Sequence, residues 1–151
     1  MSCLSSRGFH REEGQAQVEF ALSIMVVLFT VFFSWELLMA MYTASVMADA
    51  AKEGVRYAIV HGSNSTLCSG PNPSNPCASD PAGDEVVNRV KTYAQASLHD
   101  IGAINVAVTY PDGTNEPPNR VTVAVTYTYV PYINIPFAPT LTTKAAGRIV
   151  N

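Results

Sequence analysis

Residues 14–60 read GQAQVEFALSIMVVLFTVFFSWELLMAMYTASVMADAAKEGVRYAIV, and this stretch decides the architecture of the chain. Between Phe20 and Ala48, about 29 residues carry one formal charge, Glu36, whereas a helix needs roughly 20 apolar residues to cross a bilayer. No other stretch of the sequence is long and apolar enough to cross one. Helical periodicity continues to the end of the quoted stretch, where the turn-forming residues HGSNST follow. We therefore predict one long helix whose first part, residues 15–44, is transmembrane and whose second part belongs to a folded domain.

Length and charge limit what the rest of the chain can be. The protein has 151 residues, and the part after the predicted span, residues 45–151, is enough for a single core. The formal net charge is −3 and charged residues make up 14% of the sequence, with no basic or acidic block. This spread of charge gives no reason to expect a nucleic-acid partner.

The most informative spacing lies just before the apolar run. Gly14 is followed by four residues, then by Glu19 and Phe20, where the hydrophobic helix begins. This arrangement resembles the cleavage site of type IV prepilins. Together with the Glu36-Leu37 pair and the segment AKEGVRYA at residues 51–58, it resembles the TadE-like family of pilus-assembly pseudopilins. The resemblance covers about 45 residues after Gly14.

The resemblance implies a specific event at the start of the helix. Residues 1–14, which are polar and expected to have no fold of their own, would be a leader, and a prepilin peptidase would cut the bond between Gly14 and Gln15. The new amine of Gln15 is largely protonated near neutral pH and lies one helical turn from Glu19. In prepilins this glutamate aligns an incoming subunit. The alternative is an ordinary interfacial glutamate at a helix start, where the helix dipole favours a negative charge.

Glu36 is the one charge inside the apolar run. Seventeen residues separate it from Glu19, which places the two about 26 Å apart along a helix, close to the roughly 30 Å of a hydrocarbon core. We expect Glu36 at the membrane interface, because a carboxylate is costly at the bilayer centre. In the competing register Glu36 lies deeper and needs a partner in a neighbouring helix.

Small residues recur along the second half of the predicted helix. The predicted helix-packing positions are Ala40, Ala44, Ala48, Ala51 and Gly54. Such a stripe allows another element to approach closely. Packing against the protein's own domain is favoured over a dedicated oligomer face.

Two cysteines bracket the short segment SGPNPSNP. Cys68 and Cys77 are interpreted as a small disulfide, because zinc needs four ligands and His61 is the one further candidate nearby. Two free thiols in a polar loop are the alternative. A disulfide would place this part of the chain in an oxidising compartment. Neither a metal nor a cofactor is predicted.

The remaining pattern predicts an α+β domain. A loop is expected over residues 62–83, then a second helix over 84–99 with apolar residues at helical spacing. Alternating apolar residues predict strands at 103–110 and 120–130, and a third strand is expected at 140–150. The predicted fold is a long N-terminal transmembrane helix continuing into a small pilin-like domain with a second helix and a three-stranded antiparallel sheet.

No catalytic motif has adequate spacing, so the sequence does not predict an enzyme. The resemblance implies a pseudopilin of tight-adherence (Flp-type) pili in the bacterial inner membrane, with its domain outside the cytoplasm. Implied partners are the prepilin peptidase, other pseudopilins and platform proteins. The alternatives are an unprocessed, membrane-anchored binding domain and, less favoured, an anchored hydrolase. Cleavage by signal peptidase near Ala50 is disfavoured, because signal sequences have apolar runs of only about 7–15 residues.

Overall fold

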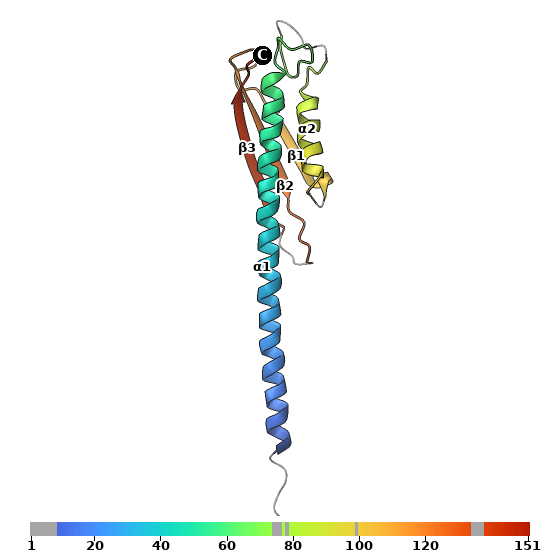
Figure 1. Cartoon of the computed structure of the whole chain (residues 1–151), viewed down its shortest axis with the longest axis vertical. Helices are drawn as coiled ribbons and strands as arrows, with labels where there is room; N and C mark the ends of the chain where they lie inside the picture. The colour runs from blue at the N-terminus through green and yellow to red at the C-terminus, as the bar shows by residue number, and fades with distance from the viewer. Residues whose placement is uncertain (1–8, 74–76, 78, 99, 134–137) are drawn as a thin grey trace, which may run out of the picture. The chain divides into compact units, whose positions relative to one another are not determined.

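A computed structural model describes residues 9–73, 77, 79–98, 100–133 and 138–151. Its elements, in chain order, are α1 (Phe9–Val60), α2 (Asp84–Gln95), the 3-10 helix η1 (Ile101–Ala103), β1 (Ile104–Thr109), β2 (Arg120–Thr128) and β3 (Thr140–Arg148) (Figure 1). The predicted α+β class is confirmed. Parts of the predicted leader (residues 1–8), loop (74–76 and 78) and second helix (99) lie outside the described residues.

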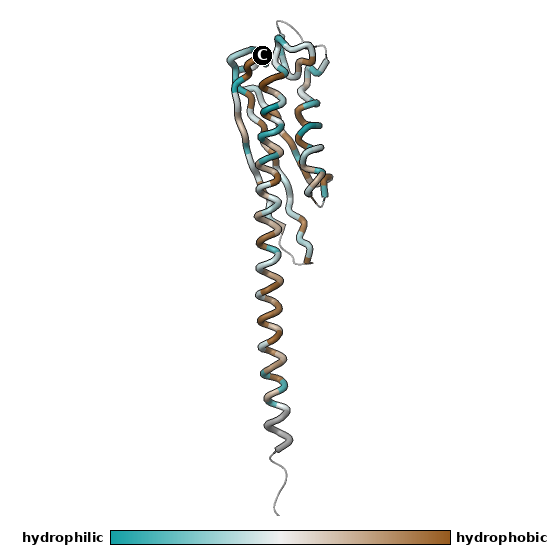
Figure 2. Tube along the Cα trace, viewed as in Figure 1, coloured by the Kyte–Doolittle hydropathy of each residue, from teal (hydrophilic) through white to brown (hydrophobic). Residues whose placement is uncertain are grey.

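The chain divides into two compact units, Met1–Leu38 and Met39–Asn151. In the first unit, the helical residues from Phe20 onward are apolar on all sides, and most of their side chains are exposed (Figure 2). The hydroxyl of Thr30 donates to the carbonyl of Val26 at 2.9 Å, and that of Ser34 donates to the carbonyl of Thr30 at 2.8 Å. These polar side chains are therefore satisfied by the helix itself, as a lipid environment requires.

The start of α1 differs from the prediction. The prediction has a leader without a fold of its own over residues 1–14 and a helix from residue 15, whereas the helix begins at Phe9, five residues before Gly14. Once a long helix exists, each further residue adds a hydrogen bond without a new nucleation cost, so polar flanking residues extend it.

The second unit is a helix-covered antiparallel sheet with strand order β1-β2-β3. Alternate residues of β2 are buried on the face toward the helices, including Val121, Val123, Val125 and Tyr127. On the opposite face, Ala107, Ala124 and Lys144 are neighbours across the three strands. The strands are shorter at their ends than the predicted ranges, and α2 ends at Gln95. Tyr129 follows β2 but is still buried, and its N–H donates to the carbonyl of Pro139 at 3.0 Å.

At Gly54, α1 lies close to both α2 and the sheet. A Cβ atom added there would contact Val90 Cγ2 and would lie 3.5 Å from Val123 Cγ1 and 3.6 Å from Val86 Cγ1. The absence of a side chain at Gly54 therefore allows the three elements to pack together.

The packing face of α1 differs from the predicted small-residue stripe. Its buried residues recur at the i, i+3, i+4 spacing of one helix face: Thr43, Val46, Met47, Ala50, Ala51, Gly54, Val55 and Ala58. Ala40 and Ala48 are half-buried, and Ala44 is exposed. A step of four residues turns about 40° beyond a full helical turn, so a stripe built on such steps drifts away from the core. Thus, Ala44 does not pack against the domain.

Candidate functional site

The predicted processing site lies in the second turn of α1. Gly14 is exposed, and an added Cβ atom there would meet nothing within 4 Å. Gln15, which follows it, is also exposed. The fold therefore places no steric demand on Gly14, and a requirement for glycine at this position must come from whatever binds the segment.

Glu19 and Phe20 lie on α1 one turn beyond this bond. Both side chains are exposed, and 69% of the Phe20 side chain is accessible in the isolated chain. Positions four residues apart on a helix are neighbours, with Cβ atoms about 5–6 Å apart. An amine at Gln15 and the carboxylate of Glu19 are therefore within reach of each other, either in one chain or between adjacent chains.

Glu36 is 6% exposed, whereas its neighbours Trp35 and Leu37 are 54% and 50% exposed. The carboxylate is thus shielded at a position where the adjacent side chains are open to the surroundings. Its predicted location at the membrane interface stays a prediction.

The domain core limits how far lipid can extend along α1. Thr43, Val46 and Met47 are buried in the domain, so they cannot face lipid. The stretch from Phe20 to Met41 rises about 33 Å, which is enough for a hydrocarbon core of about 30 Å. Thr43 is therefore not one of the lipid-facing residues of the span predicted over residues 15–44.

The polar end of the domain is held together by Asp80 and a disulfide. Cys68 and Cys77 form the predicted bond, with an S–S distance of 2.07 Å. Next to it, the Ser69 hydroxyl donates to Asp80 Oδ2 at 2.6 Å. The backbone N–H groups of Asp84 and Glu85 donate to the same carboxylate at 2.8 and 2.9 Å. Asp80 thus caps the N-terminus of α2 and ties it to the disulfide loop.

Two further side chains complete this network at the carbonyl of Ser69. The Tyr110 hydroxyl and the Asn115 amide donate to it at 3.3 and 3.1 Å. Burial, with the nearby charge of Asp80, raises the pKa of Tyr110 to about 12. Tyr110 is therefore a neutral donor at physiological pH, and this network is structural.

The charge of Asp80 is retained despite its burial. Desolvation raises the pKa of the carboxyl, but the hydrogen bonds from Ser69 and from the N–H groups of α2 outweigh it, so the net pKa is below its usual value. Because the folded pKa is lowered, this carboxylate stabilises the fold above its unfolded pKa, and the stabilisation is lost as the pH falls through the folded pKa.

We expect an Asp80→Asn variant to have a lower Tm than the wild type at pH 7, because a charged cap is replaced by a neutral one. The substitution of a helix cap costs about 0.5–2 kcal/mol. At acidic pH, where Asp80 is itself protonated, the difference in Tm should shrink. Thermal unfolding followed by circular dichroism in detergent at both pH values measures this. Asp49→Asn, which removes an exposed carboxylate from α1, is the control; an Asp80→Asn difference that is equal at both pH values would contradict the assignment.

Sequence reasoning missed Asp80 and the exposed pair Asp112 and Arg120. Arg120 Nη2 lies 2.9 Å from Asp112 Oδ1, and these hydrogen bonds lower the pKa of Asp112 to about 2. Asp80 lies four residues before the first residue of α2, whereas the sequence signal for a cap is a residue directly before the helix, so this signal does not mark Asp80. Among the described residues, no cluster of three or more His, Cys, Asp or Glu side chains is arranged to hold a metal ion.

The long exposed apolar helix and the small α+β domain together define a class: candidate single-pass membrane proteins with one domain outside the bilayer. Within the described residues, one helix is long and apolar enough to cross a membrane. The model of the TadE-like protein family matches residues 14–56, so the resemblance is confirmed over that segment. The match suggests a membrane protein related to Tad pili. Comparisons with curated proteins and with solved structures give no match.

Proposed function

We propose that this protein is a pseudopilin-like subunit that contributes to the assembly of tight-adherence (Flp-type) pili. Its role is structural, and the chemistry is performed on it: a prepilin peptidase cuts the bond between Gly14 and Gln15. The observation that carries the proposal is the exposed Gly14, with Glu19 one turn beyond the bond, inside the segment that matches the TadE-like family.

The proposed location is the bacterial inner membrane, with α1 crossing once and the domain outside the cytoplasm. Arginines precede the apolar run, and Lys52 and Arg56 follow it. The positive charges on the two sides balance, so they do not set the orientation of the helix in the membrane. The Cys68–Cys77 disulfide supports an oxidising compartment for the domain. The proposed partners are the peptidase, other pseudopilins and the platform proteins of the pilus system.

Glu19 provides the test of the assembly role. A Glu19→Ala variant should still reach the membrane and fold, because the side chain is exposed and makes no contact that the domain needs. Pilus output, measured as surface filaments, should fall, since the amine of Gln15 loses its carboxylate partner. Gln17→Ala, an exposed change two residues earlier, is the matched control and should leave output unchanged.

Wild-type pilus output from Glu19→Ala cells would count against the assembly role. Together with an uncut leader, that result would favour the alternative of an anchored binding domain without a pilus function.

A further inference from the structure

The residue that would begin the cleaved chain is a glutamine, and a glutamine with a free amine can react with its own side chain. Gln15 is exposed, and a Cβ atom added at Gly14 before it would meet nothing within 4 Å. The nitrogen and the side-chain carboxamide of Gln15 therefore both lie in open surroundings, where no packing prevents them from meeting.

The reaction closes a ring within this one residue. The amine nitrogen attacks the side-chain carbonyl carbon Cδ, an N–Cδ bond forms and the Cδ–Nε2 bond breaks. One proton passes from the amine to the departing nitrogen, which leaves as ammonia, so the first residue becomes 5-oxoproline. While Gln15 is joined to Gly14, its nitrogen belongs to a resonance-stabilised peptide bond and does not attack. Cleavage after Gly14 is therefore what makes the reaction possible.

The helical conformation of Gln15 allows the ring to close. The ring contains only the nitrogen, Cα and side-chain atoms of that residue, so no neighbouring backbone has to move. Helical side chains favour χ1 near −60° or 180°, and the first of these places Cγ gauche to the nitrogen, as ring closure requires. The first N–H groups of a helix have no partner within the helix, so the reaction breaks no backbone hydrogen bond of α1.

Protonation controls this reaction, because an ammonium group has no lone pair with which to attack. At the N-terminal end of a helix, the helix dipole disfavours a positive charge and so favours the reactive, neutral amine. Glu19 has the opposite effect: it is exposed, lies one helical turn further on, and its negative charge favours the ammonium form. The two effects therefore compete at the new N-terminus.

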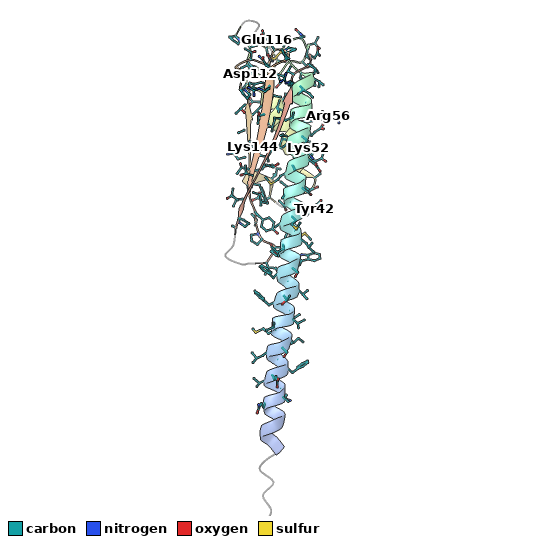
Figure 3. All side chains as sticks on the ribbon, turned by 90° about the vertical axis from the view of Figure 1, so that its left-hand side faces the viewer. Tyr42, Lys52, Arg56, Asp112, Glu116 and Lys144 are labelled. Atoms are coloured by element: carbon teal, nitrogen blue, oxygen red, sulfur yellow. A yellow bond between two sulfur atoms is a disulfide. The ribbon has the colours of Figure 1, made fainter. Side chains whose placement is uncertain are left out.

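Glu19 is the one acidic or basic side chain between Gln15 and Trp35. Cleavage would also remove the charged residues of the leader. The charged side chains labelled in Figure 3 all belong to the second unit: Lys52, Arg56, Asp112, Glu116 and Lys144. Within the first unit, Glu19 is thus the residue placed to counter the helix dipole at Gln15.

We propose that Gln15 is a modification site of the cleaved chain, where loss of ammonia would close the first residue to 5-oxoproline, and that Glu19 protects it by holding the amine as ammonium. This inference rests on the cleavage in the proposed function. It gives Glu19 a second role, because a chain closed to 5-oxoproline has no charge at its first residue. Such a chain cannot pair with Glu19, either its own or that of an adjacent chain.

The test compares the wild type with Glu19→Gln, which keeps the size of the side chain and removes its charge. Both are produced in cells with the peptidase, extracted, and placed in phosphatidylcholine vesicles, which carry no net charge. Intact mass is followed over time at about pH 6.5 and about pH 9.5, on either side of the range in which an α-amine titrates. Tandem mass spectrometry distinguishes loss of ammonia at Gln15 from any change at Gln17, whose nitrogen stays in a peptide bond. Asp49→Asn, which removes an exposed carboxylate much further along α1, is the matched control.

At about pH 6.5, Glu19→Gln is expected to lose ammonia from Gln15 about 1.5- to 5-fold faster than the wild type, as an exposed ion pair would allow. Asp49→Asn should match the wild type. At about pH 9.5 the amine is neutral in every chain, so the rates should converge, which a structural effect of the substitution would not produce. Equal rates at the lower pH, or faster loss from the wild type, would overturn the proposal, because Glu19 would then not protect the amine.

The same spectra separate this inference from the cleavage on which it rests. A wild-type chain that keeps its leader would show that the cleavage is wrong, whereas chains that begin at Gln15 and react at equal rates would refute only the protection by Glu19. If Glu19→Gln alone keeps its leader, residues 1–14 of both chains are exchanged for a segment that an added site-specific protease removes directly before Gln15. The same comparison of rates then decides.

Discussion

A Gly14→Val variant is expected to accumulate in the membrane with its first 14 residues attached and with its fold intact. A Cβ atom at position 14 meets nothing within 4 Å, so the larger side chain costs the structure no contact. Valine also has a higher helix propensity than glycine, which is about 1 kcal/mol less favourable than alanine. Any loss of processing must therefore come from recognition by the peptidase and not from misfolding.

Intact-mass analysis of the membrane-extracted variant measures its N-terminus, and circular dichroism measures its fold. Gln17→Val, three residues further along the exposed helix, is the matched control and should be processed like the wild type. If Gly14→Val is trimmed at the same bond as efficiently as the wild type, Gly14 does not define a processing site.

A Gly54→Leu variant is expected to destabilise the domain by about 1–3 kcal/mol, the usual cost of overpacking a well-packed core. The new side chain would collide with Val90 and crowd Val86 and Val123, so α1, α2 and β2 would have to move apart. Chemical unfolding followed by circular dichroism in detergent should show an earlier midpoint.

Ala44→Leu is the control for this experiment, because it makes the same kind of enlargement on the exposed side of the same helix. Exposed substitutions usually change stability by less than about 0.5 kcal/mol. Equal midpoints for Gly54→Leu and the wild type would show that the three elements do not meet at Gly54.

The fold was predictable where a single sequence pattern determines a helix or a strand. The apolar run predicts α1, and the alternation of Val121, Val123, Val125 and Tyr127 predicts a strand with one buried face; both are present. The packing face of α1 was not predictable from small residues. The side of a helix that faces the core is the one whose side chains together bury more apolar area. Val46 and Met47 bury more apolar area than Ala44 would.

Only those residues of the site that lie close together in the sequence were predictable. Gly14, Gln15 and Glu19 form a motif that a sequence displays directly, and helix geometry places them on one exposed segment. Asp80 was not found, because its role depends on the disulfide loop turning back to bring Ser69 to its carboxylate, a tertiary contact.

We propose that proteolysis after Gly14 creates an ammonium group one helical turn from Glu19. Intact-mass analysis of the native protein, extracted from the membranes of cells that assemble pili, tests it most directly. We expect a polypeptide that begins at Gln15. A polypeptide that begins at Met1 in those cells would contradict it, and one that begins near Ala51 would show a secreted protein without the anchoring helix.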